Sequence, residues 1–159
     1  MRRSDREITG FDGKLEILRR CEVLHLGLSD GGRPYVVPLS FGVRAENGSA
    51  AVYFHCAASG RKLDLLRADP RVCFEADRLL GIAGADEACG WTAKYESVMG
   101  EGRAVTVEDP AEKAEGLLCI LRHYGYEGGP EFAPAVFART AVVRIDVESL
   151  SAKSNEKNQ

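Results

Sequence analysis

The stretch that decides the fold is residues 24–56, LHLGLSDGGRPYVVPLSFGVRAENGSAAVYFHC. Apolar side chains alternate with small or polar ones in three segments, as in β-strands with one buried face: residues 24–28, 35–43 and 52–56. The turn cluster SDGGRP separates the first two segments. Asn47-Gly48, the strongest short-range signal for a β-hairpin, separates the second from the third. The stretch therefore predicts a three-stranded antiparallel meander.

Further strands and helices are predicted around this meander. Ser59 is expected to cap a helix that ends at Ala68, and Asp109-Pro110-Ala111-Glu112 has the cap, first-turn proline and capping-box glutamate of a second helix. A shorter helix is expected over residues 14–20. The remaining strands are predicted at 71–76, 94–107 and 136–147. Six strands with two or three peripheral helices, and no strand–helix–strand alternation, favour a closed antiparallel barrel.

Length and composition describe an ordinary globular chain. Its 159 residues suit one domain over residues 1–159, with flexible ends expected at 1–10 and 151–159. Twenty-one basic against 24 acidic residues give a net charge of −3, which argues against a nucleic-acid partner. No apolar run approaches the roughly 20 residues that span a membrane, and the charged N-terminus is not a secretory signal. Five cysteines without a C-x-x-C pair indicate free thiols, so we expect a cytoplasmic protein.

The predicted helix that follows Ser59 has an unfavourable charge distribution at its N-terminus. Its first turn carries Arg61 and Lys62, although a helix N-terminus disfavours cations. Two cations beside free backbone N–H groups make a phosphate receptor, but solvated surface charges explain the pair equally well. His55, one strand residue earlier than Cys56, is either a hydrogen-bonded structural residue or a catalytic one. No motif of a P-loop enzyme, a Rossmann fold or a zinc hydrolase is present.

Five segments together resemble the pyridoxamine-5′-phosphate-oxidase-like flavoproteins, and within them the nitroimidazole-resistance (Nim) branch. The resemblance runs from about Arg3 to Ser151 and rests on PYVVPLSF at 34–41, VYFHCA at 52–57, GRKLDLL at 60–66, PRVCFE at 70–75 and YESVMGEGRA at 95–104. It implies a split β-barrel and a homodimer that binds FMN at the subunit interface.

The resemblance also assigns residues. It implies that Arg61 and Lys62 hold the FMN phosphate and that His55 and Cys56 face the cofactor, with His55 as the catalytic residue. It implies further cofactor contacts at Val37, Pro38, Leu39, Ser40, Tyr95 and Ser97. The last strand, RIDVESL at 144–150, lacks the substrate-binding arginine segment of true pyridoxamine-phosphate oxidases, so that activity is not expected.

Two classes of function follow from the resemblance. The first is an FMN-dependent oxidoreductase that takes electrons from a small reductant and reduces a small acceptor such as a nitro-aromatic. The second is a non-catalytic FMN-binding or haem-binding protein, for which histidine, cysteine, methionine or tyrosine side chains would supply the haem ligand. A deazaflavin in place of FMN is a variant of the first class. The sequence alone does not separate these alternatives.

Overall fold

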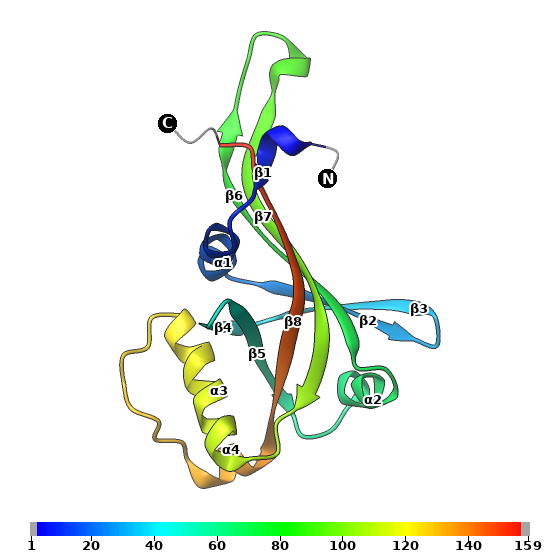
Figure 1. Cartoon of the computed structure of the whole chain (residues 1–159), viewed down its shortest axis with the longest axis vertical. Coiled ribbons are helices and arrows are strands. Elements are labelled where there is room, and N and C mark those ends of the chain that lie inside the picture. The colour runs from blue at the N-terminus through cyan, green and yellow to red at the C-terminus, as the bar shows by residue number, and fades with distance from the viewer. Residues whose placement is uncertain (1–2, 157–159) are drawn as a thin grey trace.

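The computed structural model describes residues 3–156 (Figure 1). Eight strands and four α-helices lie within these residues, with two 3-10 turns at Ser4–Arg6 and Ala88–Gly90. The strands are β1 (Glu7–Ile8), β2 (Leu24–Asp30), β3 (Arg33–Leu39), β4 (Phe41–Glu46), β5 (Ser49–Ala57), β6 (Arg71–Ala83), β7 (Thr92–Thr106) and β8 (Thr140–Ser154). The helices are α1 (Phe11–Arg20), α2 (Arg61–Ala68), α3 (Pro110–His123) and α4 (Pro134–Arg139).

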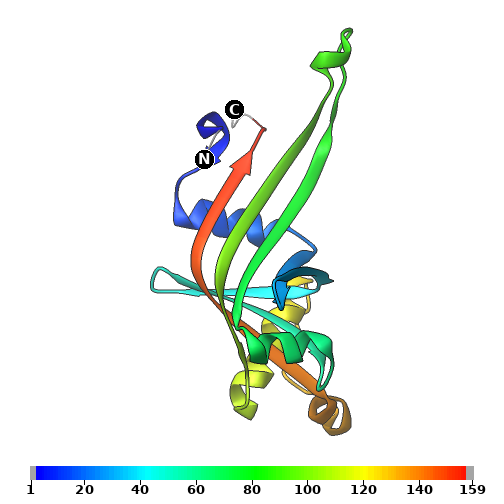
Figure 2. The same cartoon turned by 90° about the vertical axis from the view of Figure 1, so that its right-hand side faces the viewer.

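All strands join one antiparallel sheet. Its order is β3-β2-β6-β7-β8-β5-β4, and β1 pairs with β8. The strands at the two ends of this order, β3 and β4, are consecutive in the chain, so the polypeptide passes from one end of the sheet to the other at Ser40. The long β6–β7 hairpin projects beyond the other strands (Figure 2). The expected class, a mainly β split barrel with peripheral helices, is confirmed.

One face of each strand contributes to the main core. Leu24, Leu26 and Leu28 of β2 are at most 6% exposed, and the alternate residues of β5 and β6 join them. Helices α1 and α2 cover this core with the apolar residues Ile17, Leu18, Leu63 and Leu66. A smaller core of Tyr53, Val107, Ile120 and Val142 lies on the opposite face of β5 and β8, under α3. Strand β5 therefore separates two packed regions.

The strand count differs from the expected six for two reasons. The segment 35–43 is divided at Ser40, because its first part pairs with β2 and its second part with β5. The short strand β1 pairs with Ala152 and Lys153 of β8, so the termini expected to be flexible are partly in the sheet. Residues 1–2 and 157–159 of those termini lie outside the described residues.

Three local expectations were wrong. Residues 136–139 form part of α4 rather than a strand, and Pro134 at the first helical position explains why a helix starts there. Ser59 does not cap α2, whose cap is Gly60 with a φ of 136°, a value that favours glycine. Strand β6 extends seven residues beyond the predicted Ala76, to Ala83. The Asp109 cap of α3 is confirmed, since its side chain accepts a hydrogen bond from the Glu112 N–H at 2.8 Å.

No helix in residues 3–156 is both long enough and apolar enough to span a membrane.

Close packing of α3 on β4 depends on Gly42. A Cβ at this position would lie 2.5 Å from the carbonyl carbon of Cys119 and 2.6 Å from the Ile120 nitrogen, which are backbone atoms of the helix. We therefore expect Gly42→Ala to lower the free energy of unfolding by about 1–3 kcal/mol, measured by urea denaturation. Gly129→Ala is the control, because a Cβ there meets no atom within 4 Å. Equal stability of the two variants would contradict this packing.

Candidate functional site

The candidate site is the start of α2, where the chain turns out of β5 (Figure 1). Gly60 precedes the helix and supplies no side-chain cap, so the N–H groups of the first turn remain available to a bound group. Arg61 and Lys62 occupy this first turn. The N-terminal dipole of the helix and two cationic side chains thus coincide, as the sequence predicts. This combination favours an anion, and a phosphate in particular.

Of the two cations in this turn, Lys62 has no counter-charge within residues 3–156. Its Nζ lies 5.4 Å from the centre of the Phe54 ring, and within residues 3–156 no carboxylate pairs with it. Burial lowers the pKa of Lys62, because the ammonium form loses hydration that no partner replaces. The half-buried thiol of Cys56 is the titratable group that acts on Lys62, and burial raises the pKa of this thiol. The neutral thiol does not compensate the ammonium, so a bound anion would stabilise it.

Arg61 is held by two contacts. Its Nη2 donates to Oδ2 of Asp30 at 2.6 Å, and its guanidinium lies 4.5 Å from the centre of the Tyr35 ring. The ion pair raises the pKa of Arg61, so the side chain stays charged. A guanidinium has five N–H donors, and the pair with Asp30 leaves some of them free. Arg61 is therefore a positioned cation, already partly neutralised, beside the uncompensated Lys62.

His55 and Cys56 point to opposite faces of β5. Cys56 packs against the main core, on the side of Lys62. His55 lies opposite Val142 of β8, on the face that α3 covers further along the strand, and is exposed. Within the described part of the chain, no hydrogen bond or ion pair holds its ring. Within residues 3–156 of one chain, His55 is therefore neither buried nor hydrogen-bonded through its ring, and its catalytic role stays a prediction.

The predicted cofactor contacts on β3 divide between the two faces of that strand. Val37 and Leu39 are half-buried against the main core, whereas Pro38 is exposed and pairs with His25 of β2. Ser40 is exposed at the crossing from β3 to β4. A molecule bound on one face of β3 can therefore contact only every second residue of this segment.

An open groove of about 530 Å³ lies on the outer face of β2 and β6, away from the main core. Gly27 and Cys73 are paired on its floor, and a Cβ at Gly27 would lie 2.6 Å from the Cys73 sulfur. Val36 forms one side, and Asp69 from the end of α2 forms another. Arg61, Lys62 and His55 do not line it.

Tyr95 and Ser97 lie far from α2 within one chain. They pair with Leu79 and Asp77 on the projecting β6–β7 hairpin. Strand β6 begins three residues after α2 ends, and the eight steps from Arg71 to Leu79 span about 26 Å at the usual rise of a strand. Tyr95 is therefore remote from the end of α2 where β6 begins.

One further cluster has the donors of a metal site. The ligand atoms of His25, Glu75 and Asp77 lie within 4.8 Å of one another on the outer face of β2 and β6. The Nδ1 of His25 is 3.3 Å from a Glu75 oxygen. Burial and the neighbouring Asp77 raise the pKa of Glu75. The histidine already partners one carboxylate, and this arrangement alone does not require an ion.

The sequence comparison identifies the family. Residues 14–154 match the family described as pyridoxamine 5′-phosphate oxidase. The chain belongs to this family. No curated protein matches it.

Several proteins of solved structure share this fold. The chain is 26% identical to a proposed 5-nitroimidazole antibiotic resistance protein from Bacteroides thetaiotaomicron, with a TM-score of 0.79 over 92% of this chain and 85% of that one. It is also 26% identical to the flavocytochrome Anf3 from Azotobacter vinelandii, with a TM-score of 0.79 over 98% of this chain and 72% of that one. An FAD and haem binding protein from Mycobacterium smegmatis, 16% identical with a TM-score of 0.78 over 95% and 74% of the two chains, supports the fold alone.

Sequence reasoning missed the residues that hold the two cations. Asp30 and Tyr35 contact Arg61, and Phe54 lies under Lys62. Asp30 belongs to a turn cluster, where an acidic residue needs no partner to be explained. Tyr35 and Phe54 occupy ordinary strand positions. No local signal distinguishes these three residues, because their roles depend on how α2 packs on the sheet.

Proposed function

We propose that the chain binds FMN with the phosphate at the start of α2, and that it is an oxidoreductase which reduces a small acceptor such as a nitro-aromatic. The observation that carries the proposal is Lys62, a half-buried ammonium without an anionic partner in residues 3–156, at a helix N-terminus beside Arg61. A terminal phosphate matches this donor set in charge and in hydrogen bonding. The 26% identical proteins from Bacteroides and Azotobacter, one described as a nitroimidazole resistance protein and one as a flavocytochrome, support the same class.

The bound FMN would supply the redox chemistry. The chain's own residues would bind and orient it. Lys62 and Arg61 would hold the phosphate, and Gly60 would let the backbone turn sharply enough for the first-turn N–H groups to reach it. His55, an exposed imidazole free of other partners in the described residues, would hold or donate a proton to the acceptor.

We further propose that the protein is a homodimer with the cofactor between the subunits. Tyr95 and Ser97 can join α2 at one site only if they come from the second copy. The outer face of the sheet also exposes large apolar side chains, among them Val36 at 61% and Met99 at 60%. Such side chains on a sheet face are typical of an interface.

The absorption spectrum of the purified protein tests the proposed function. We expect flavin maxima, release of FMN on denaturation, and bleaching of the flavin by NADH or NADPH under anaerobic conditions, followed by reoxidation with a nitro-aromatic. Light scattering on the same preparation should give the mass of two chains. A Soret band without flavin would support the haem-binding alternative, and a reducible flavin that no acceptor reoxidises would leave a binding protein without the proposed activity.

A further inference from the structure

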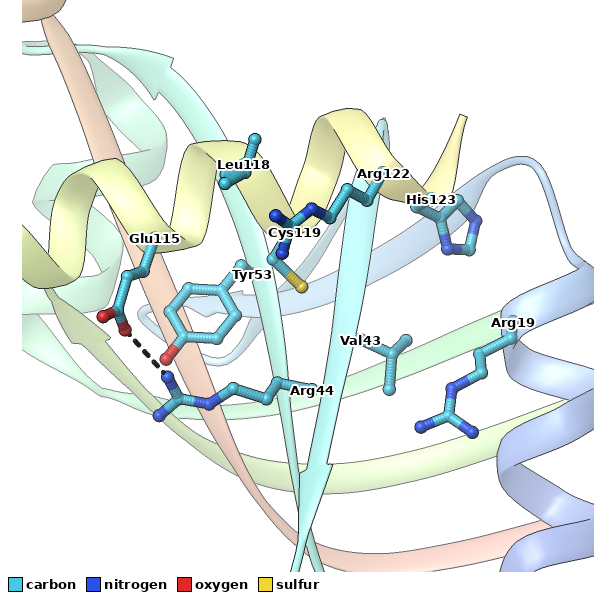
Figure 3. Close-up of a pocket in the computed structure, with 9 residues that line it drawn as sticks. All are labelled: Arg19, Val43, Arg44, Tyr53, Glu115, Leu118, Cys119, Arg122 and His123. Atoms are coloured by element: carbon cyan, nitrogen blue, oxygen red, sulfur yellow. Dashed lines mark hydrogen bonds and ion pairs between the residues drawn. The ribbon is translucent and has the colours of Figure 1, made fainter. Parts of the chain in front are cut away.

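A second pocket lies between α3, β4 and α1, away from the candidate cofactor site (Figure 3). It encloses about 590 Å³. Three arginines line it from three different elements: Arg19 of α1, Arg44 of β4 and Arg122 of α3. Tyr53, which also lines the pocket, lies on the opposite face of β5 from Phe54 and Lys62. The pocket is therefore separate from the phosphate site proposed above.

The arginines are only partly neutralised. Arg44 pairs with Glu115 at 3.2 Å and lies 5.6 Å from the centre of the Tyr53 ring. Neither Arg19 nor Arg122 has an ion pair or a side-chain hydrogen bond within residues 3–156. Three guanidinium groups thus face a single carboxylate, and the pocket carries an excess of positive charge on a chain whose net charge is −3.

The other polar groups of the pocket do not supply the missing negative charge. All three arginines lie close enough to Cys119 to act on its thiol, but burial raises the pKa of Cys119 and keeps it neutral. His123 donates from Nε2 to the Cys21 carbonyl oxygen at 2.7 Å, and its ring packs on Phe41. The His123 ring is therefore held in place and forms one side of the pocket. The three arginines are exposed at the rim of the pocket, and a bound anion would supply the negative charge that residues 3–156 do not place there.

The space between the arginines is apolar. Val43 and the half-buried Cys119 lie between the guanidinium groups, and the buried side chains of Leu118 and Tyr53 complete the lining (Figure 3). Arg19 approaches from α1 on one side, whereas Arg44 is drawn toward Glu115 on the other (Figure 3). The charges are therefore spread around an apolar floor rather than gathered at one point.

We propose that this pocket binds a small organic molecule with two anionic groups at the ends of a short apolar body. Each end would meet a guanidinium group, whose planar fork matches both a carboxylate and a phosphate. The body would lie over Val43 and Cys119. An inorganic anion satisfies one arginine and leaves the apolar floor in water, so it is the poorer ligand.

Calorimetric titration of the full chain at constant ionic strength tests the proposal, with and without added FMN. The probes are succinate, glutarate and adipate, with butyrate, inorganic phosphate and sulfate as controls, and 3-phosphoglycerate to distinguish a phosphate from a carboxylate end. We expect at least one of the two-headed probes to bind about tenfold or more tightly than butyrate or sulfate. Added FMN should not compete with the probe. Binding at this pocket and binding at the proposed cofactor site are therefore tested independently.

Substitutions of pocket residues test whether the probe binds in this pocket. Arg19→Gln and Arg122→Gln should each lower the affinity for the best probe by about tenfold or more, since each removes one charge-assisted contact. Glu115→Gln should strengthen it, because it releases Arg44 from its ion pair. Arg139→Gln, at the end of α4 and outside the pocket, removes the same charge and should leave the affinity within about twofold.

Three results would overturn the proposal. They are equal affinity for the two-headed probes and sulfate, equal losses in Arg122→Gln and Arg139→Gln, and displacement of the probe by FMN. Arg122→Lys, which keeps the charge but loses the planar fork, serves if Arg122→Gln lowers the melting temperature; it should still weaken the probe.

Discussion

Replacing Arg61 and Lys62 together by alanine is expected to weaken FMN binding by about 10²–10⁴-fold and to leave riboflavin binding nearly unchanged. Each charge-assisted hydrogen bond to a phosphate contributes about 1.5–3 kcal/mol, and the two flavins differ only in that phosphate. The single variant Lys62→Ala should lose more than Arg61→Ala, because Asp30 already neutralises part of the Arg61 charge. Fluorescence quenching of each flavin on titration with protein measures both affinities.

Arg67→Ala is the matched control for this double variant. Arg67 belongs to the last turn of the same helix, is exposed, and pairs with Asp64. Its loss should leave the preference for FMN over riboflavin intact. Equal losses of FMN and riboflavin affinity in the double variant would show that the pair supports the fold instead of binding the phosphate.

The preference for FMN should also depend on pH. Burial lowers the pKa of Lys62 below its ordinary value of 10.5. The charged form, which binds the phosphate, exists below that lowered pKa, so the preference should be complete at pH values well below it and should decline as the pH rises through it. Bound phosphate favours the charged form and raises the pKa of Lys62 in the complex, so the decline begins at the pKa of the free protein and levels off above the pKa of the complex. Lys62→Arg should remove the dependence, because an arginine stays charged throughout this range. An unchanged ratio up to pH 10.5 in the native protein would contradict the assignment.

Replacing His55 by alanine is expected to lower the rate of acceptor reduction by about 10²–10⁴-fold per bound flavin, the usual effect of losing a general acid. The structure indicates that this substitution separates catalysis from stability. His55 is exposed, and no other group in residues 3–156 depends on its ring for a hydrogen bond. Its loss should therefore leave the melting temperature and the flavin content unchanged. Stopped-flow reoxidation of the reduced protein by a nitro-aromatic measures the step directly.

A matched histidine serves as the control for His55→Ala. His123 is held by the Cys21 carbonyl oxygen and packs on Phe41, so His123→Ala should lower stability while the rate per folded, flavin-bound molecule stays constant. Unchanged turnover per bound flavin in His55→Ala would reject the catalytic role.

Much of the fold was predictable because its signals are local. Alternation in β2 and β5, the Asn47-Gly48 turn and the Asp109 cap each depend on a few neighbouring residues, and covalent geometry translates them directly into strands, a hairpin and a helix start. The adjacency of Arg61 and Lys62 at a helix N-terminus was likewise visible in the sequence, since it requires only the position of the helix.

The tertiary structure decided the rest. The alternation from 35 to 43 continues without a break, so only the choice of pairing partners divides it into β3 and β4. The difference between Arg61, held by Asp30, and Lys62, left half-buried without a counter-ion in the described chain, depends on how α2 packs against the sheet. The three arginines of the second pocket come from α1, β4 and α3, and each resembles a solvated surface charge in its own segment. The sequence by itself determined which side chains each element carries and in what order. Only packing between segments distant in the chain, which fixes burial and the distances between charges, determined which cations lack a partner.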